Sequence, residues 1–145
     1  MDKKDRALSP SDFGFHNAIR GQEQIHFIDF EYFGWDDPAK LTSDFLLHPA
    51  MSLSEDLKQY WSREMAEVFC DSSDYAERLG LAYSMYGLCW CLILLNEFCD
   101  EDMGRRIFAD SAKVDITQEQ DHQLQKSERL LGSISRYYEQ GFPYE

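Results

Sequence analysis

Three polar residues near the start of the sequence have the types and the spacing that phosphoryl transfer requires. Asp12 and Asn17 lie five residues apart in a glycine-containing segment, and Asp29 follows on a predicted extended strand. Transfer of a phosphoryl group from ATP needs a carboxylate that orients the attacking hydroxyl and accepts its proton. It also needs hard oxygen ligands that hold Mg²⁺ against the phosphates. Asp12, Asn17 and Asp29 could supply this set, but Asp and Asn are also ordinary turn residues.

The strand that carries Asp29 is predicted to belong to a β-hairpin. Two short extended runs, residues 17–20 and 24–30, flank a connection that contains Gly21. A glycine-containing connection of this length between two such runs is typical of a hairpin. The residues before it, 1–10, are polar and are expected to be loose.

Alternation along the second strand predicts which side chains share a face. Asp29 and Glu31 are expected on one face, and Ile28 and Phe30 are expected to point the other way, towards the helices. A turn is predicted over residues 33–38, where Gly and Pro interrupt the pattern.

The remainder of the sequence has the apolar periodicity of helices. Ser52 and Glu55 form a capping-box pattern that predicts one helix start, and Thr117 and Gly141 predict the two ends of the last helix. The helix that begins at Asp74 is apolar nearly all round in its second half, so we expect it to be the buried central element. The predicted helices cover residues 39–47, 52–69, 74–98, 100–113 and 117–140.

Composition indicates one ordinary globular domain over residues 1–145. The hydrophobic fraction is 43% and the charged fraction 28%, as in proteins with a packed core. The net charge of −13 argues against nucleic acid as a partner, because phosphate backbones bind basic surfaces. It suits a cationic small molecule, or it reflects only a solvated acidic exterior.

No membrane partner is predicted, and a cytoplasmic location is expected. The longest uninterrupted apolar run, residues 88–95, is too short to span a bilayer, and no signal-peptide pattern opens the sequence. The four cysteines include no CxxC pair and no His partner at zinc spacing. Cys89 and Cys91 lie in the most apolar segment, so buried free thiols are expected.

Residues 11–17 (SDFGFHN) and 27–45 (FIDFEYFGWDDPAKLTSDF) resemble the aminoglycoside phosphotransferase and choline kinase family, which has a protein-kinase-like fold. The resemblance covers residues 9–49, and its IDFEY run is particularly similar to the choline and ethanolamine kinase branch. It implies that Asp12 is the catalytic base and that Asn17 and Asp29 are the Mg²⁺ ligands.

The same resemblance implies the substrates and their surroundings. ATP would be the phosphoryl donor, and the acceptor would be a cationic alcohol or an aminoglycoside. The acceptor would bind in an acidic cleft made by Glu31, Asp36, Asp37 and the helices. Asp44 falls on a residue that supports the backbone of the catalytic loop from a helix start, so a structural role is expected for it.

Two departures from the family pattern stand beside this resemblance. Pro10 and Ser11 occupy the positions where the family has His-Gly, and we interpret this as a subfamily variant. The nearest histidine is His16, which directly precedes Asn17. We expect His16 to have a role in the turn rather than as a metal ligand.

The second departure is that no GxGxxG or GxxxxGK pattern occurs in the sequence. The only lysines before Asp12 are Lys3 and Lys4. Protein kinases hold ATP with such a loop and a strand lysine. The chain is therefore expected to be a C-terminal lobe without its N-terminal lobe. Residues 9–38 would carry the catalytic loop and metal-binding strand, and residues 39–141 would be the helical part.

Three functions stay open. In the first, the chain is the C-terminal, catalytic half of a small-molecule kinase, and we do not expect the chain alone to turn over ATP. Alternatively, it is a non-catalytic interaction module that self-associates or pairs with a separate N-terminal lobe. A metal-dependent phosphohydrolase using Asp12 and Asp29 is the third.

Two further groups of residues allow both a structural and a functional interpretation. Aromatic residues at helical spacing are expected in the core, or they line a box for a quaternary ammonium group through cation–π attraction; they are Tyr83, Tyr86, Trp90 and Phe98. Residues 100–102 are interpreted as the acidic first turn of a helix rather than as a metal site.

Overall fold

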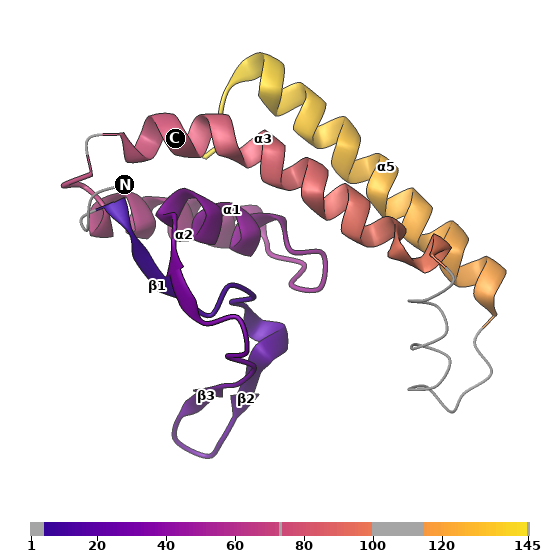
Figure 1. The fold of residues 1–145 in the computed structure, drawn as a ribbon, viewed down its shortest axis with the longest axis horizontal. Coiled ribbons are helices and arrows are strands. Elements are labelled where there is room, and N and C mark those ends of the chain that lie inside the picture. Colours follow the sequence, from indigo (N-terminus) through magenta and orange to yellow (C-terminus); the bar gives the residue numbers. More distant parts are fainter. Residues whose placement is uncertain (1–4, 73, 100–114, 145) are drawn as a thin grey trace.

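The structure is a computed structural model that describes residues 5–72, 74–99 and 115–144, and its fold is α+β and mostly helical (Figure 1). Two small antiparallel sheets come first and the α-helices follow, so the predicted mostly helical α+β class is confirmed. The strands are β1 (Ala7–Ser9), β2 (Ala18–Arg20), β3 (Ile25–Phe27) and β4 (Gly34–Asp36). The helices are α1 (Pro38–Leu47), α2 (Glu55–Val68), α3 (Tyr75–Leu94) and α5 (Ile116–Gln140), with short 3-10 helices η2 (Phe15–Asn17) and η3 (Leu95–Phe98).

The predicted hairpin is present as β2 and β3, but its second strand is shorter than expected. Ile19 pairs with His26 at the centre of the antiparallel register. The strand ends at Phe27, and Asp29 has a φ of 63°. A left-handed residue cannot continue a β-strand, so the prediction that Asp29 lies on the strand is wrong.

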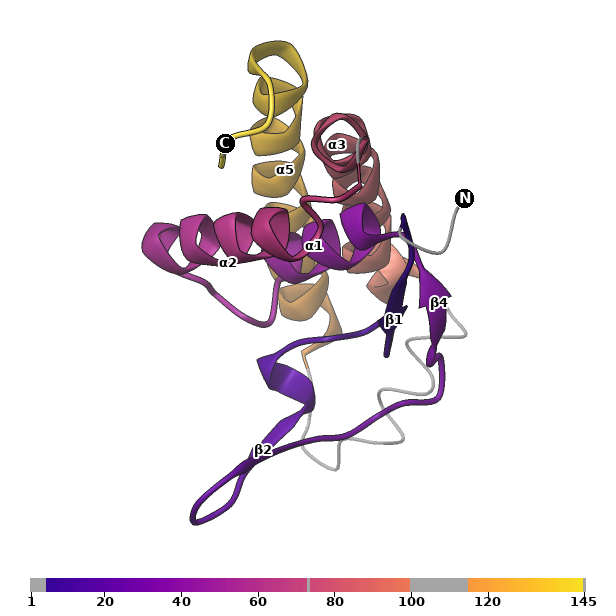
Figure 2. The ribbon, with the colours of Figure 1, turned by 90° about the vertical axis from the view of Figure 1, so that its left-hand side faces the viewer.

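The hairpin projects away from the helices, as both ribbon views show (Figures 1 and 2). Ile28 and Phe30 are 45% and 49% exposed, so the prediction that they pack towards the helices is wrong. Alternation identified two faces, but no helix covers either face along β3, all of whose residues are exposed.

A second sheet joins two segments that were expected to be irregular. β1 pairs with β4 in antiparallel register, with Leu8 opposite Trp35. Residues 1–10 were predicted to be loose and residues 33–38 to form a turn, and both predictions are wrong where these strands lie. Each strand is only three residues long and pairs with a distant segment, which local sequence patterns do not report.

The start of α1 agrees with the prediction because its local chemistry is strong. Asp37 caps the helix, its side chain accepting the N–H of Ala39 at 2.8 Å, and Pro38 occupies the first turn. This combination of an Asp cap and an N1 proline is a common helix start. Farther along, the buried Thr42 hydroxyl lies 2.8 Å from the Tyr75 hydroxyl of α3, which ties the two helices together.

Two helix starts were predicted at the wrong residue. The cap of α2 is Ser54 rather than Ser52, and the cap of α5 is Asp115 rather than Thr117. Ser, Thr and Asp have similar capping chemistry, so a pattern with two candidates close together cannot choose between them. The predicted end of α5 at Gly141 is confirmed, and its φ of 96° is one that glycine adopts readily.

α3 lies between α1 on one side and α5 on the other (Figure 1), so its predicted central position is confirmed. Its predicted burial all round is wrong, because Leu81 and Leu92 are 73% and 67% exposed. For the same reason Cys91 is buried but Cys89 is exposed. The core residues are Ala39, Met65, Tyr75 and Leu79 in one cluster and Leu46, Leu47, Tyr83 and Tyr144 in another.

One helix in the described part of the chain, Tyr75–Phe98, is long and apolar enough to cross a membrane by length and composition. The core helix of a bundle meets the same two criteria, and this helix packs against α1 and α5. The helix predicted over residues 100–113, with its acidic first turn, lies outside the described residues.

Candidate functional site

The loop before β2 brings Asp12 and Asn17 together as the sequence predicts. The Asn17 side-chain amide donates to the main-chain oxygen of Asp12 at 3.0 Å and to its Oδ2 at 3.3 Å. The 3-10 turn η2 closes the loop, with the Asn17 N–H donating to the Gly14 oxygen at 3.1 Å. The five-residue spacing thus places a carboxylate and an amide side by side.

Phe13 anchors this loop between the hairpin and the helices. Its ring centroid lies 4.9 Å from that of Phe27 in β3 and 5.8 Å from that of Phe45 in α1. It also stacks at 6.0 Å on Trp61 of α2. Because Asp12 immediately precedes this ring, the packing fixes where the carboxylate can lie.

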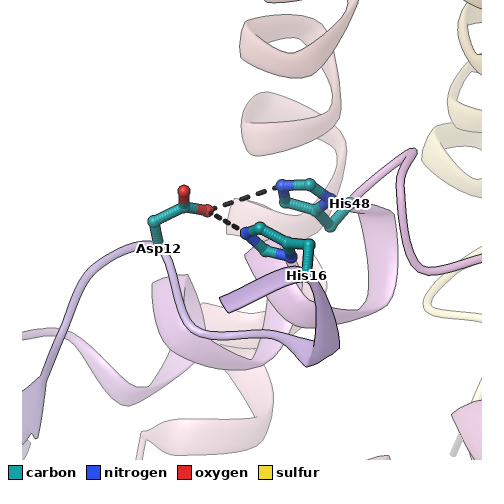
Figure 3. A group of neighbouring side chains, drawn as sticks. All are labelled: Asp12, His16 and His48. Carbon is teal, nitrogen blue, oxygen red and sulfur yellow. Dashed lines mark hydrogen bonds and ion pairs between the residues drawn. The ribbon is translucent and has the colours of Figure 1, made fainter. Parts of the chain in front are cut away.

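Two histidines complete the site around Asp12 (Figure 3). Oδ1 of Asp12 lies 3.1 Å from Nε2 of His16 and 3.4 Å from Nε2 of His48. The two imidazole rings stack with centroids 3.9 Å apart and an interplanar angle of 15°. His16, expected to have only a turn role, therefore contacts the predicted catalytic residue.

Sequence reasoning missed His48, which was interpreted only as the end of a helix before Pro49. His48 is the C-cap of α1 and lies 36 residues after Asp12 along the chain. Pro10 and Ser11 stand before Asp12 where the family that the segment resembles has His-Gly, and this difference was a reason to look for a histidine elsewhere. Only the packing of α1 beneath the loop identifies which one it is.

The hydrogen bonds of His48 define its protonation. The N–H of Ala50 donates to Nδ1 of His48 at 3.1 Å, so the proton of the neutral ring is on Nε2, facing Asp12. Burial lowers the pKa of His48, the neighbouring His16 lowers it further, and Asp12 acts in the opposite direction. The Nε2 proton of a neutral His48 therefore lies on the side of the ring that faces Oδ1 of Asp12, 3.4 Å away.

The close spacing of Asp12, His16 and His48 raises the question of whether they bind a metal ion. The ligand atoms of Asp12, His16 and His48 all lie within 4.8 Å of one another. Neighbouring ligand atoms around a tetrahedral zinc are roughly 3.3 Å apart, given its bond lengths of about 2.0–2.1 Å. Coordination through Nε2 of His48 would, however, need the ring proton on Nδ1, where the Ala50 N–H already points. The geometry favours a hydrogen-bonded carboxylate over a zinc centre.

Asp29 and Glu31 do not join this group. The N–H of Ile28 donates to the Asn17 oxygen at 2.9 Å, which holds the segment after β3 beside the loop. Asp29 follows in a left-handed conformation and is exposed. Such backbone strain is frequent at functional sites, but within the described chain no hydrogen bond or ion pair joins Asp29 to Asp12 or Asn17. Glu31 raises the pKa of its neighbour Tyr32 through a hydrogen bond and its charge.

Asp36 and Asp37, predicted to bind a cationic substrate, make structural contacts at the start of α1. An Asp36 oxygen lies 2.8 Å from Nζ of Lys40. Asp37 caps the helix and pairs with Nε of Arg78 in α3 at 3.2 Å. These partners account for both carboxylates without a substrate.

Asp44 supports the loop indirectly. It lies within α1, where Oδ2 pairs with Nζ of Lys40 at 3.0 Å and Oδ1 accepts the Trp90 indole N–H at 3.1 Å. Lys40 in turn donates to the Ser11 hydroxyl at 3.1 Å, next to Asp12. Burial raises the pKa of Asp44, and Lys40 partly offsets this.

The other predicted features lie apart from Asp12. Tyr83 is 2% exposed in the core while Phe98 is 49% exposed, so the four helical aromatics do not line one box. A cavity of about 470 Å³ lies between α2, α3 and the C-terminal segment, next to Arg63, Tyr75 and Phe142. None of its lining residues belongs to the Asp12 site.

Comparison of the chain with protein-family models, with curated proteins and with solved structures found no match. The geometry of the site and the sequence pattern around it therefore carry the functional proposal.

Proposed function

We propose that the chain is the catalytic half of a small-molecule phosphotransferase that moves the γ-phosphoryl group of ATP to a hydroxyl of a cationic acceptor, aminoglycoside-like or choline-like. The observation that carries the proposal is the closed loop in which Asn17 is bonded to both the main chain and the side chain of Asp12. A base and an adjacent amide oxygen are what this chemistry needs at one place. The resemblance of residues 9–49 to the aminoglycoside phosphotransferase and choline kinase family points the same way.

In this proposal Asp12 is the general base. Its side chain is 45% exposed, so an acceptor hydroxyl can reach it from solvent. His16 and His48 lie against Oδ1, and a neutral His48 orients the carboxylate without neutralising it. Asp12 then accepts the proton of the hydroxyl as the acceptor oxygen attacks phosphorus.

Asn17 and Asp29 would hold Mg²⁺, and their donors fit this ion in chemical type. The Asn17 amide nitrogen binds Asp12, so its side-chain oxygen faces away from that bond. The Asp29 carboxylate supplies a second hard oxygen of the kind that Mg²⁺ prefers. When bound, Mg²⁺ would neutralise charge on the phosphates of ATP.

A second candidate function is a non-catalytic or partner-completed interaction module. The observation that favours it is the apolar surface of the hairpin and the segment after it, which the helices leave uncovered. Large exposed apolar patches are typical of interaction sites. A separately encoded nucleotide-binding lobe is the partner that this surface would serve. The exposed residues are Ile19, Ile25, Phe27, Ile28, Phe30, Tyr32 and Phe33.

Thermal unfolding in the presence of Mg·ATP tests the proposal. A ligand at a hundred times its Kd stabilises the folded state by about 2.7 kcal/mol, so the melting temperature should rise. Asp29→Ala should abolish this rise, whereas Asp56→Asn, an exposed acid of α2, should leave it intact. The same variants should be assayed for phosphate transfer from ATP to choline and to aminoglycosides, with Asp12→Asn expected to lose transfer.

The outcomes separate the two candidates. A rise that survives Asp29→Ala contradicts the ligand assignment. No rise in the wild-type chain at millimolar Mg·ATP contradicts nucleotide binding by this chain alone, and it favours the partner-completed module.

A further inference from the structure

The outward face of α3 carries a regular stripe of large apolar side chains. Leu81, Met85, Leu88 and Leu92 follow one another at intervals of four, three and four residues. Their exposed fractions are 73%, 55%, 49% and 67%. This is the a/d spacing of a helix that packs along another helix. The opposite face of α3 packs against α1 and α5, and none of the four stripe residues belongs to the two core clusters of the described chain.

α5 continues this apolar surface. α3 and α5 run antiparallel and side by side (Figure 1), as shown by Ser127 bonding the Cys91 oxygen and Gln120 bonding the Glu97 oxygen. In this register Leu131 of α5 lies level with Leu88. Residues Leu81 and Tyr138 line one shared surface hollow, so the two stripes meet. We call these residues the α3–α5 face: Leu81, Met85, Leu88, Leu92, Leu124, Leu131 and Tyr138.

The charge distribution distinguishes this surface from the rest of the chain. The chain has a net charge of −13, yet residues 79–96 contain no charged residue. Two acidic copies repel each other when they meet through ordinary surface. A face without charge at its centre keeps this repulsion smallest, and most of α3 provides one.

We propose that the α3–α5 face binds the same face of a second copy of this chain, forming a four-helix bundle from two α3–α5 pairs. A two-fold axis near Met85 and Leu88 lets each heptad stripe meet an identical one, which is the isologous contact of symmetric dimers. Four-helix bundles pack through such a/d positions. This proposal is independent of phosphoryl transfer, because none of the residues of the α3–α5 face belongs to the Asp12 site.

The dimensions of the face suit a dimer. α3 has 20 residues, so it is roughly 30 Å long at 1.5 Å per residue. Two neighbouring helices 8–10 Å apart present a width of roughly 20 Å. The projected area is therefore at most roughly 600 Å² per chain, below the roughly 800 Å² per partner of a standard interface, so the face suits a weak dimer.

The observations favour a second copy over a lipid bilayer. Helices that bind membranes carry basic residues next to their apolar segment. The apolar part of α3 is flanked by Asp74 and Glu77 at one end and Glu97 at the other, with Arg78 as the one base among these flanks. Arg78 is paired with Asp37.

Sedimentation equilibrium of the full chain tests the proposal. The wild-type protein should be a dimer at micromolar concentration. Leu88→Glu should raise the dimer Kd by roughly tenfold or more, because it buries a charge at the centre of the interface. Val68→Glu on α2 is the matched control, since Val68 is 70% exposed and lies outside the face, and its Kd should stay within about twofold of wild type. Far-ultraviolet circular dichroism confirms that each variant is folded.

Met85→Lys is the second variant in case Leu88→Glu does not fold. It reduces the net negative charge, so a weakened dimer cannot be attributed to added acidic repulsion. A wild-type chain that stays monomeric at high micromolar concentration overturns the proposal. So does a dimer that tolerates both substitutions but is broken by Ile25→Glu in the hairpin. Co-sedimentation of a monomer with phosphatidylcholine vesicles, lost in Leu88→Glu, would identify a membrane surface instead.

Discussion

The helices of this chain enclose a core of apolar side chains, whereas the β-hairpin leaves all of its large apolar side chains exposed. In the helices, Leu79, Tyr83 and Ile134 are 2–3% exposed and belong to continuous packing between α1, α3 and α5. In the hairpin, Ile25 is 59% exposed although it has the same chemistry. The comparison teaches that the helical part contains its own core, whereas the hairpin presents apolar surface that the described helices do not cover. The Asp12 site lies at the junction of the two.

The largest expected effect tests whether the core is confined to the helices. Leu79→Ala should lower the free energy of unfolding by roughly 2–5 kcal/mol, because it removes buried methyl groups and leaves a cavity. Ile25→Ala should change it by no more than about 0.5 kcal/mol, as exposed substitutions usually do. Urea denaturation followed by circular dichroism measures both. A comparable loss at Ile25 would show that the hairpin is part of the core and would break the comparison.

An intermediate effect contrasts two glycines of the same helix. A Cβ at Gly87 would meet Cγ1 of Ile134 at 2.6 Å, while a Cβ at Gly80 would meet nothing within 4 Å. Gly87→Ala should cost about 1–3 kcal/mol through overpacking. Gly80→Ala should instead stabilise by up to about 1 kcal/mol, since alanine is the better helix former.

The melting temperatures of these two variants should therefore move in opposite directions. Equal shifts would mean that α5 does not approach α3 as closely at Gly87 as the structure indicates. The two glycine variants therefore distinguish the packed face of α3 from its exposed side, and neither variant changes the charge of the chain.

The smallest expected effect concerns the junction, where burial lowers the pKa of His48 below its ordinary value of 6.5. Between the folded and the unfolded pKa the unfolded chain binds more protons, so stability should fall as the pH is lowered through about 6.5. His48→Gln should reduce this dependence between pH 7 and pH 5. Asp12→Asn should steepen it, because Asp12 is the neighbour that raises the pKa of His48.

Denaturation midpoints measured across this pH range check the sign. If stability rises on acidification in the wild type, or if both variants shift the slope in the same direction, the assigned surroundings of His48 are wrong.

Local patterns predicted α1, α3 and the end of α5 well because their determinants lie within a few residues. Asp37 and Pro38 define the start of α1, and Gly141 defines the end of α5. The patterns failed where a partner was distant, as in the β1–β4 pairing. They also failed where two neighbouring residues had the same capping chemistry, as with Ser52 and Ser54.

The residues of the candidate site likewise divide into those that local patterns predicted and those that depend on distant contacts. Asp12 and Asn17 were predicted to act together, and a single turn of backbone brings them into contact. Asp29 was predicted on an extended strand, and its left-handed conformation ends that strand before it. His48 was not predicted, since its contact with Asp12 depends on how α1 packs beneath the loop.

The sequence by itself determined that Asp12 and Asn17 lie together, because close spacing decides which side chains a short loop can bring into contact. It also determined that helices dominate the fold, because apolar periodicity and caps are local. Tertiary structure alone decided that His48 faces Asp12, that Asp36 and Asp37 are engaged by Lys40 and Arg78, and that one face of α3 stays exposed. Each of these depends on contacts between distant segments, which form only when helix packing selects one arrangement of the chain.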